Sequence, residues 1–495
     1  MNAFSPLLIN ASIPLPLILY NLTMTRIELV FIPTPTIGNL VPVVEFAKLI
    51  TKHDPRFSAT VLIITVPHRP LITTYFNSLS SSSTNLRFLH LPTVDPPAPD
   101  QYQTIVGFLS LLIQKHKHHV KHALIELIKT ESPSDSDSVQ LGAIFIDMFT
   151  TAAIDVAAEL NLPSYLFFAS PATFLGFTLH LSQIETELTE SKTELFPFPC
   201  FKNSLPRSVF PRLLFIEKNG SSWLSHHAKR YRETKGIIVN TLEELEPYAL
   251  QSLYNDSKLP RVYPIGPVLD VDGSARWDPN PVQYKHIMEW LDMQTKSSVV
   301  FLCFGSMGSM NVGQVAQIAF GLERAEFKFL WALREPPKAQ LEDPKDYTNY
   351  SDVLPDGFLD RTAEIGLVCG WVPQARVLAH EAIGGFVSHC GWNSILESLW
   401  YEVPIATWPI YAEQHMNAFE MVKELGLAVE IRLDYRDGED LVKGEEVERC
   451  VRYLMNGCDE IRSKVKEMGE KCKRSLMKNG SSYVNLVSLI EELIT

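Results

Sequence analysis

The sequence lacks the features that mark several large classes of protein. Its seven cysteines are scattered, odd in number and without a C-x-x-C pair, so a disulfide framework is not indicated and free thiols in a reducing compartment are expected. Acidic residues outnumber basic residues by 57 to 44, which gives a net charge of −13. This balance argues against a nucleic-acid partner, which needs a basic face, and against a polybasic contact with anionic lipid.

Several familiar motifs are also missing. The sequence contains no G-x-G-x-x-G, Walker A or H-E-x-x-H motif, so nothing predicts a dehydrogenase, a kinase or a zinc hydrolase. An apolar stretch at residues 6–22 is interrupted by three prolines, and no Lys or Arg precedes it, which fits neither a membrane span nor a signal peptide. We expect residues 1–23 to be a dispensable extension before Met24; a weak secretory signal is the alternative.

What the sequence does contain is a repeated alternation of apolar runs and helical segments. At 495 residues the chain exceeds the size of one hydrophobic core, so two domains are expected. Apolar strands separated by helices predict parallel sheets covered on both faces, and therefore the α/β class. We expect two doubly wound, Rossmann-like domains that face each other across a cleft and bind ligand outside the carboxyl ends of their strands.

The predicted elements divide into two sets around a Pro- and Gly-containing linker at residues 264–281. The predicted strands are residues 27–32, 58–65, 86–91, 141–147 and 163–169 in the first set, and 297–304, 327–333, 366–371, 384–389 and 403–408 in the second. The clearest predicted helices are residues 40–53 and 312–325, followed by polar-faced helical pieces at 443–478 and 481–494. Residues 131–138 are a predicted surface loop.

Residues 371–414 carry a pattern suited to binding a nucleotide. The segment 384–394, GGFVSHCGWNS, predicts a strand, a polar turn and the start of a helix, so Asn393 and Ser394 would lie at the helix N-terminus. Unpaired N–H groups and the helix dipole favour an anion there, and a diphosphate would fit without a metal ion. Glu397 could accept hydrogen bonds from ribose, and Trp371 could stack on a flat base. Singly, each residue is more simply explained by a structural role; jointly they indicate a binding site.

The same segment resembles the signature box of the plant family 1 UDP-glycosyltransferases. It opens with W-x-P-Q, continues through H-C-G-W-N-S and closes with W-P and E-Q, at the family's full length from Trp371 to Gln414. The resemblance runs from Met24 onward and includes residues 235–246, 265–269 and 299–308. It implies the GT-B fold and an inverting, metal-independent transfer of sugar, most simply glucose from UDP-glucose, to a phenolic hydroxyl or carboxylate of a small organic acceptor.

The resemblance also implies a role for each domain and for the chain as a whole. Residues 24–263 would bind the acceptor, and residues 282–478 would bind the UDP-sugar. Residues 479–495 would form a helix that crosses back to the first domain. We expect a cytoplasmic monomer of plant secondary metabolism that needs no cofactor, because the UDP-sugar is a co-substrate.

The family's donor-binding residues can be assigned position by position, and all of them are present. Trp371 would stack on uracil beside the Val372 backbone, and Gln374 and Glu397 would hold the ribose. Trp392 and Gln414 are the residues usual in users of UDP-glucose, whereas Glu402 departs from the family's usual glycine. The diphosphate would be held by Ser306, His389, Asn393 and Ser394, and the sugar hydroxyls by Trp392, Glu413 and Gln414.

The family's catalytic base is missing. A His in the loop after the first strand usually deprotonates the acceptor with the help of an Asp, but here Asn39 stands at the His position and only the partner, Asp147, is retained. Because Asn cannot act as a general base, the acceptor could arrive already ionised, or Asp147 could act as base directly or through water. The third possibility is a weakly active relative or a pseudoenzyme that only binds UDP-sugar.

A cluster of histidines offers one more candidate site. His118 and His122 are spaced i, i+4 on a predicted helix that also carries His116 and His119. That spacing would suit a metal ion, but interleaved lysines and the absence of a carboxylate favour a solvated helix face. We therefore expect no metal site in this protein.

Overall fold

The computed structural model describes residues 26–66, 69–79, 85–130, 139–190, 193–216, 220–271, 280–338, 342–436 and 440–495. The predicted extension at 1–23, the predicted loop at 131–138 and part of the predicted linker, residues 272–279, lie outside the described residues. All seven cysteines lie inside them as buried free thiols, which confirms that expectation. No helix in the described part of the chain has the length and apolarity needed to cross a bilayer.

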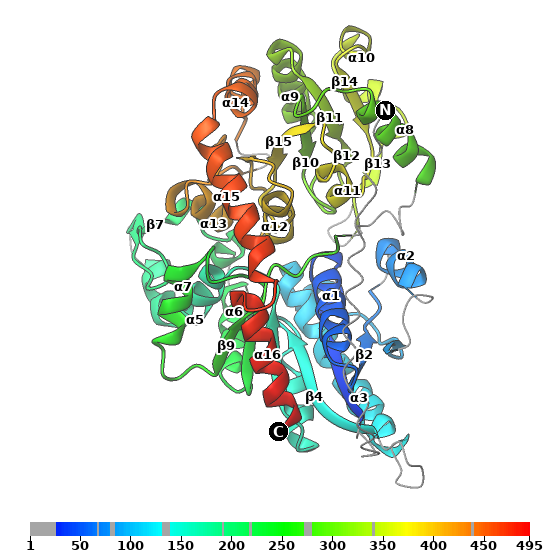
Figure 1. The fold of residues 1–495 in the computed structure, drawn as a ribbon, viewed down its shortest axis with the longest axis vertical. Coiled ribbons are helices and arrows are strands. Elements are labelled where there is room, and N and C mark those ends of the chain that lie inside the picture. The colour runs from blue at the N-terminus through cyan, green and yellow to red at the C-terminus, as the bar shows by residue number, and fades with distance from the viewer. Residues whose placement is uncertain are drawn as a thin grey trace.

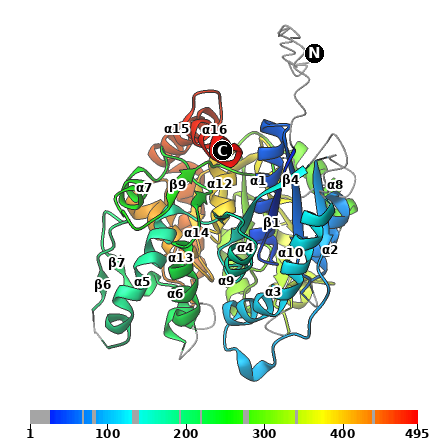
Figure 2. The same cartoon turned by 90° about the horizontal axis from the view of Figure 1, so that it is seen from below.

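The N-terminal half of the chain forms a seven-stranded parallel sheet (Figures 1 and 2). Alternate residues of β1 (Arg26–Ile32) enter different cores: Val30 and Ile32 pack on one face, Leu29 and Phe31 on the other. This double burial explains why its strands are continuous apolar runs. In sheet order the strands are β3 (Leu86–His90), β2 (Phe57–Ile63), β1 (Arg26–Ile32), β4 (Val139–Asp147), β5 (Ser164–Phe168), β8 (Gly236–Val239) and β9 (Arg261–Pro264). The helices are α1 (Ile37–His53), α2 (Pro70–Leu79), α3 (Ile105–Thr130), α4 (Ala153–Glu159), α5 (Ala172–Glu190), α6 (Gly220–Tyr231) and α7 (Pro247–Tyr254), and β6 (Leu195–Phe196) pairs with β7 (Leu205–Pro206).

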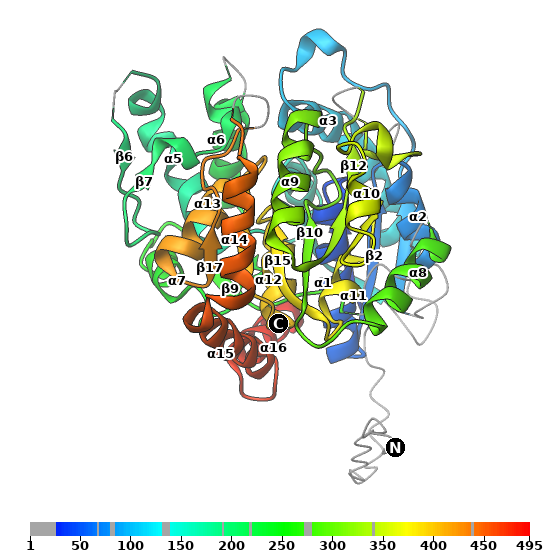
Figure 3. The same ribbon diagram turned by 90° about the horizontal axis from the view of Figure 1, so that it is seen from above.

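The C-terminal half forms a six-stranded parallel sheet of the same type (Figure 3). Its strands, in order, are β14 (Gly366–Cys369), β11 (Lys328–Ala332), β10 (Val299–Cys303), β15 (Ile383–Ser388), β16 (Ile405–Thr407) and β17 (Ala428–Glu430). Around it lie α8 (Pro281–Asp292), α9 (Val312–Ala325), α10 (Phe358–Arg361), α11 (Gln374–Leu378), α12 (Trp392–Trp400), α13 (Gln414–Phe419), α14 (Gly444–Asn456) and α15 (Asp459–Ser475), and β12 (Arg334–Glu335) pairs with β13 (Lys345–Asp346). One more helix, α16 (Ser481–Ile494), follows them in sequence.

The two sheets share one topology, and it determines where a ligand can bind. In each sheet the strand order reverses beside the first strand, between β1 and β4 and between β10 and β15. Loops at the carboxyl ends of such strand pairs diverge to opposite faces and leave room for a ligand. The prediction of two doubly wound α/β units is therefore confirmed.

Several local predictions need correction. The short strands β8, β9 and β17 were not predicted, because strands of three or four residues carry too little periodic signal. The helical piece at 443–478 is two helices, α14 and α15, separated at Gly457 and Cys458. The histidine cluster is not a uniformly solvated face: His116 is fully buried and its Nδ1 lies 2.9 Å from the carbonyl oxygen of Leu112. Among the described residues no group of three or more His, Cys, Asp or Glu side chains could hold a metal ion.

The last helix, α16, packs on the N-terminal half although it follows the whole C-terminal half in sequence (Figure 1). Leu486, Leu489 and Ile490 enter the core on one face of the first sheet. The hydroxyls of Tyr165 and Tyr263 both donate to the carboxylate of Glu492. The two halves are thus fastened by a helix as well as by their direct interface.

A buried pair of carboxyl groups joins the two halves beside α5. Glu246, from the N-terminal half, accepts hydrogen bonds from the backbone N–H groups of Ala172 and Thr173 at the start of α5. Glu420, from the C-terminal half, accepts from the Thr173 hydroxyl at 2.7 Å and also shares a hydrogen bond with Glu246. Burial raises the pKa of both carboxyl groups, and the negative charge of Glu246 raises that of Glu420 further. The pair therefore retains a proton between its two acids.

This shared proton predicts a loss of stability at alkaline pH. A carboxyl whose pKa is raised by folding stabilises the fold while protonated, and the stabilisation is lost as pH rises through the raised pKa. The melting temperature should therefore fall as pH rises above the range in which carboxyl groups ordinarily titrate. Glu420→Gln, which keeps an amide donor for Glu246 and an oxygen for Thr173, should flatten this dependence. Glu289→Gln, at an exposed carboxylate of α8, is the control and should leave it intact; equal slopes in wild type and Glu420→Gln would contradict the shared proton.

Candidate functional site

The first switch point brings Asn39 and Asp147 together, although they lie far apart in sequence. Asp147 ends β4, and Asn39 lies in the first turn of α1, after the loop that leaves β1. The Asn39 amide nitrogen donates to Asp147 Oδ1 at 3.2 Å, and the Thr36 hydroxyl donates to Asn39 Oδ1 at 2.8 Å. Because the carboxylate can only accept, this network fixes which end of the Asn39 amide faces it. Asn39 and Asp147, the two positions of the predicted catalytic pair, are thus in direct contact.

Asp147 itself is closed off from solvent. Its side chain is 0% exposed, Oδ2 accepts from the Thr34 backbone N–H at 3.1 Å, and Oδ1 also accepts from the Met148 N–H. Burial raises the pKa of Asp147 to about 6, against the opposing effect of these hydrogen bonds. Because the carboxylate is fully buried, an acceptor hydroxyl could contact either oxygen only if surrounding groups moved aside.

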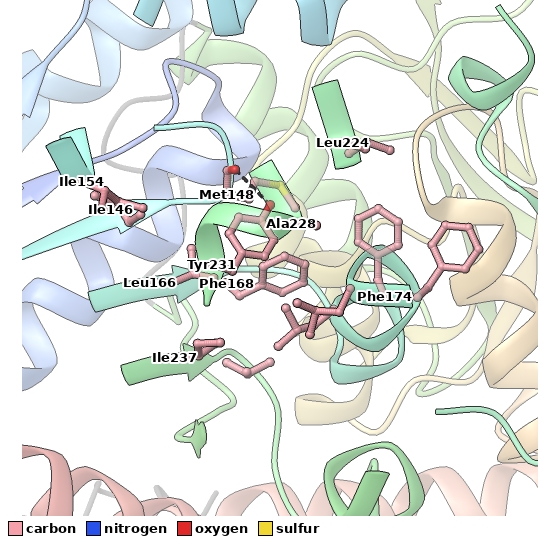
Figure 4. Close-up of a cluster of buried hydrophobic side chains, with 14 of the residues drawn as sticks. Ile146, Met148, Ile154, Leu166, Phe168, Phe174, Leu224, Ala228, Tyr231 and Ile237 are labelled. Carbon is pink, nitrogen blue, oxygen red and sulfur yellow. Dashed lines mark hydrogen bonds between the residues drawn. The ribbon is translucent and has the colours of Figure 1, made fainter. Parts of the chain in front are cut away.

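The loop that carries Asp147 is held from several directions. The Thr150 hydroxyl donates to the carbonyl oxygen of Ile32 at the end of β1. The Tyr231 hydroxyl donates to the carbonyl oxygen of Met148, and both side chains lie in the apolar cluster of Figure 4. On the other side, His227 lies between the hydroxyls of Thr151 and Ser110, at 2.7 and 2.8 Å. Hydrogen bonds on several sides therefore hold the loop that carries Asp147 in place.

The second switch point forms a narrow, glycine-lined seat around His389. The imidazole lies between Gly305, in the turn after β10, and Gly391, in the turn after β15, and a Cβ on either glycine would come within 2.6 Å of its Nε2. Gly305 has φ +77°, a conformation that favours glycine. Burial lowers the pKa of His389 to about 4, so the ring is neutral at physiological pH. Its buried Nδ1 has no hydrogen-bond partner within the described chain.

Three predicted residues form one connected polar group next to this seat. The side-chain nitrogen of Gln374 donates to Ser394 Oγ at 2.8 Å and to Glu397 Oε2 at 2.7 Å. Gln374 begins α11, whereas Ser394 and Glu397 lie one turn apart on α12. Burial raises the pKa of Glu397 to about 7, so its carboxyl changes charge near neutral pH. The predicted ribose residues and one predicted phosphate residue are thus adjacent.

Trp371 and Val372 lie beside this group, between β14 and α11. The backbone carbonyl oxygen of Trp371 accepts a hydrogen bond from the Gln283 side chain at 2.9 Å. The backbone N–H of Trp371 donates to Asp346 Oδ1 at 2.9 Å. Sequence reasoning did not identify Gln283 or Asp346, because nothing in their own neighbourhoods indicates a site. Ser306, a further predicted phosphate residue, is half-buried in the turn directly after Gly305.

The residues predicted to contact the sugar lie on the same side of the second sheet. Gln414 is 3% exposed, and its side-chain oxygen accepts from the N–H groups of Ile410 and Tyr411, both at 3.0 Å. Its amide nitrogen lies close enough to the Tyr411 hydroxyl to oppose the rise in the Tyr411 pKa that burial causes. Glu413 accepts from the Ser170 hydroxyl, 3.3 Å away in the N-terminal half, and burial raises its pKa.

Two predicted ligand residues instead bridge the two halves through their side chains. Trp392 Nε1 donates to the carbonyl oxygen of Asn240 at 2.7 Å, and the Asn393 side chain donates to the carbonyl oxygen of Gly38 at 2.8 Å. The indole has no second donor, so any contact of Trp392 with a sugar would use its backbone. Asn393 retains a buried side-chain oxygen without a hydrogen-bond partner in the described chain.

Glu402, which replaces the family's usual glycine, adopts a backbone conformation that explains why glycine is usual at this position. It follows the end of α12 and has φ +62°, in the left-handed region that disfavours residues with a Cβ. Its carboxylate forms an ion pair with Lys473 at 2.6 Å. The substitution affects the end of α12 and its contact with α15.

Comparisons with known proteins match most of the length of this chain. A family profile described as "UDP-glucoronosyl and UDP-glucosyl transferase" matches residues 136–449. The chain is 68% identical over 470 residues to UDP-glycosyltransferase 43 of Pueraria montana var. lobata, covering 95% of this chain and 100% of that protein. It is 46% identical to UDP-glucose flavonoid 3-O-glucosyltransferase 6 of Fragaria ananassa, covering 94% and 99% of the two chains.

Solved structures give the same result for the fold. A Medicago truncatula protein complexed with UDP-glucose matches with a TM-score of 0.85 at 39% identity, covering 96% of this chain and 99% of that one. A transferase from Siraitia grosvenorii in complex with UDP matches with a TM-score of 0.84 at 43% identity, covering 95% and 100%. The GT-B arrangement expected from the sequence is thereby confirmed.

The glycine seat around His389 can be tested by stability alone. Gly305→Ala should destabilise the protein by about 1–3 kcal/mol, because it combines an unfavourable positive φ with a clash against the ring. Gly38→Ala is the matched control, since no heavy atom lies within 4 Å of its added Cβ, and it should leave stability unchanged or slightly higher. Chemical denaturation of the two variants measures the difference. Equal stabilities would mean that the seat does not confine His389.

Proposed function

Because this chain belongs to the family of UDP-glucuronosyl and UDP-glucosyl transferases, we propose that it transfers glucose from UDP-glucose to the phenolic hydroxyl or carboxylate of a small organic acceptor. The chain is a UDP-dependent glycosyltransferase that acts on small acceptors; the choice of sugar, the class of acceptor and the residue roles are our proposal. In it, residues 24–263 bind the acceptor, 282–478 bind the donor, and 479–495 form the returning helix. The reaction inverts the anomeric carbon.

The proposed donor site follows the polar groups of the C-terminal half. Trp371 stacks on uracil beside the Val372 backbone, and the Gln374–Glu397 pair accepts and donates hydrogen bonds at the ribose. Ser306, neutral His389, Ser394 and the free N–H groups at the start of α12 surround the diphosphate. The unpaired, buried Nδ1 of His389 supports this arrangement, because a buried polar atom without a partner is costly unless a ligand supplies one.

The proposed preference for glucose depends on Gln414. Its oxygen is held by two backbone N–H groups, and its amide nitrogen also interacts with the Tyr411 hydroxyl. The amide is thereby oriented, and its second hydrogen is the proposed donor to sugar hydroxyls. Glu413 supplies an acceptor beside it, and Trp392 contributes through its backbone because its indole N–H is bonded to Asn240. A site that hydrogen-bonds particular hydroxyls discriminates against sugars whose hydroxyls point elsewhere.

The proposed class of acceptor rests mainly on the burial of Asp147. Of the possible replacements for the missing base, direct action by Asp147 is disfavoured because it is 0% exposed and both its oxygens accept hydrogen bonds. Asn39 has a second amide hydrogen that Asp147 does not use. That hydrogen can donate to the acceptor's oxygen and stabilise it as an anion. This combination favours acceptors that ionise near neutral pH, such as carboxylic acids and acidic phenols.

We also propose that the protein is a cytoplasmic monomer that needs neither cofactor nor metal ion. The seven buried free thiols support a reducing compartment. The donor site supplies neutral hydrogen-bond donors for the diphosphate, which supports metal-independent transfer. Plant secondary metabolism is the context in which such relatives are named.

The donor proposal predicts a specific response to changes at Gln414. Wild-type kcat/KM should be at least about tenfold higher for UDP-glucose than for UDP-galactose or UDP-glucuronic acid. Gln414→Glu keeps an oxygen for the N–H groups of Ile410 and Tyr411 but removes the amide donor, so kcat/KM for UDP-glucose should fall by about 10–100-fold while UDP affinity is unchanged. Gln414→His should weaken glucose use as well. Comparable rates with all three donors in the wild type would refute the preference.

The acceptor proposal predicts how rate depends on acceptor acidity. Across a series of phenols at pH 7, wild-type kcat/KM should fall steeply as acceptor pKa rises. Asn39→His restores a titratable pair with Asp147, so acceptors of high pKa should gain up to about 10²–10⁴-fold, whereas acceptors already ionised should gain little.

Two controls make this experiment decisive. Asp147→Asn in the Asn39→His background should abolish the gain, because the new His would lose its oriented partner. Asn39→Ala should slow ionised acceptors, because it removes the proposed N–H donor. If Asn39→His changes nothing and the wild type binds UDP-glucose without turnover, a UDP-sugar-binding protein replaces the proposed enzyme.

A further inference from the structure

Arg69 is a buried cation that the proposed donor site does not yet use. It lies between β2 and α2 in the N-terminal half and is only 7% exposed. Its Nη1 lies 3.7 Å from Asp343 Oδ1 and 3.9 Å from the sulfur of Met307, both in the C-terminal half. Its buried Nε has no hydrogen-bond partner within the described chain. A guanidinium carries five N–H donors, and burying it with so few bonds is costly unless a ligand completes them.

The neighbours of Arg69 indicate where that ligand would be. Met307 directly follows Ser306 in the turn after β10, which also holds Gly305 against the His389 ring. Tyr411 is close enough to interact electrostatically with Arg69, and its ring centroid lies 6.4 Å from that of His389. Arg69 therefore reaches, from the opposite half, toward the proposed diphosphate position.

The charge balance of the site makes this approach significant. None of the proposed donor residues is Lys or Arg, and His389 is neutral at physiological pH. During transfer the bond between the anomeric carbon and the β-phosphate oxygen breaks, the electron pair stays on that oxygen, and the acceptor oxygen forms the new bond to carbon. The departing diphosphate thus gains negative charge, which a buried cation would stabilise strongly.

We propose that Arg69 binds the diphosphate of the donor and stabilises UDP as it departs. The guanidinium donates hydrogen bonds and transfers no proton. Asp343 competes for the same group: it holds Arg69 at ion-pair distance, and that contact must loosen for Arg69 to bond phosphate oxygens. The inference rests on the proposed donor site and adds to it a residue of the other half.

Binding measurements with truncated ligands test the proposal on the full-length protein. Calorimetry with UDP, UMP and uridine compares wild type, Arg69→Gln, Arg69→Lys and Asp343→Asn. Arg69→Gln should weaken UDP binding by about 10–100-fold, weaken UMP binding less and leave uridine binding unchanged. Arg69→Lys, which keeps the charge without the planar fork, should lie between. Asp343→Asn should leave UDP binding unchanged or tighter, because it removes the competing anion.

The alternatives give different patterns. If Arg69 only fastens the two halves, Asp343→Asn should weaken UDP binding as much as Arg69→Gln does, and uridine binding should weaken equally; either result overturns the proposal. If Arg69→Gln affects only the KM of a carboxylate acceptor, Arg69 binds the acceptor and the proposal is wrong. If wild type binds UDP but Arg69→Gln binds it equally well, only this inference fails. Failure of wild type to bind UDP would remove the donor site itself.

Discussion

Two adjacent side chains on the first turn of α12 hold the two halves of the molecule in register. Trp392 donates to the backbone of Asn240 and Asn393 donates to the backbone of Gly38. Gly38 precedes Asn39, so the helix proposed to face the diphosphate is bonded directly to the turn proposed to face the acceptor. In the proposed complex these hydrogen bonds to the backbone would help to set the distance between donor and acceptor, and such positioning is a large part of catalysis.

Burial, more than sequence neighbourhood, controls the charge of the groups in this site. It raises the pKa of Asp147 to about 6 and of Glu397 to about 7, and it lowers that of His389 to about 4. Near neutral pH, His389 is consequently neutral and Glu397 is only partly charged, while Asp147 keeps most of its negative charge. Under these conditions a single guanidinium such as that of Arg69 has a strong influence, because few mobile charges screen it.

The parts of the site that sequence could predict are those defined by local pattern. The strand, turn and helix around His389 are encoded in eleven consecutive residues, and Asp147 ends an apolar run, so the amino-acid order is enough to assign both. The contacts between the halves could not be predicted: Trp392 and Asn240 are 152 residues apart, and Asn393 and Gly38 are 355 apart. The contacts of Arg69 could not be predicted either, because no residue near it in sequence indicates that it lies beside Met307 and Asp343.

The return of α16 to the first sheet has a consequence for how the molecule is made. Leu486, Leu489 and Ile490 cover one face of a sheet whose strands all lie before residue 265. A ribosome releases those strands long before it synthesises their cover. An apolar surface of the N-terminal half therefore stays exposed while the entire C-terminal half is translated. Chaperones bind nascent chains that expose such surfaces.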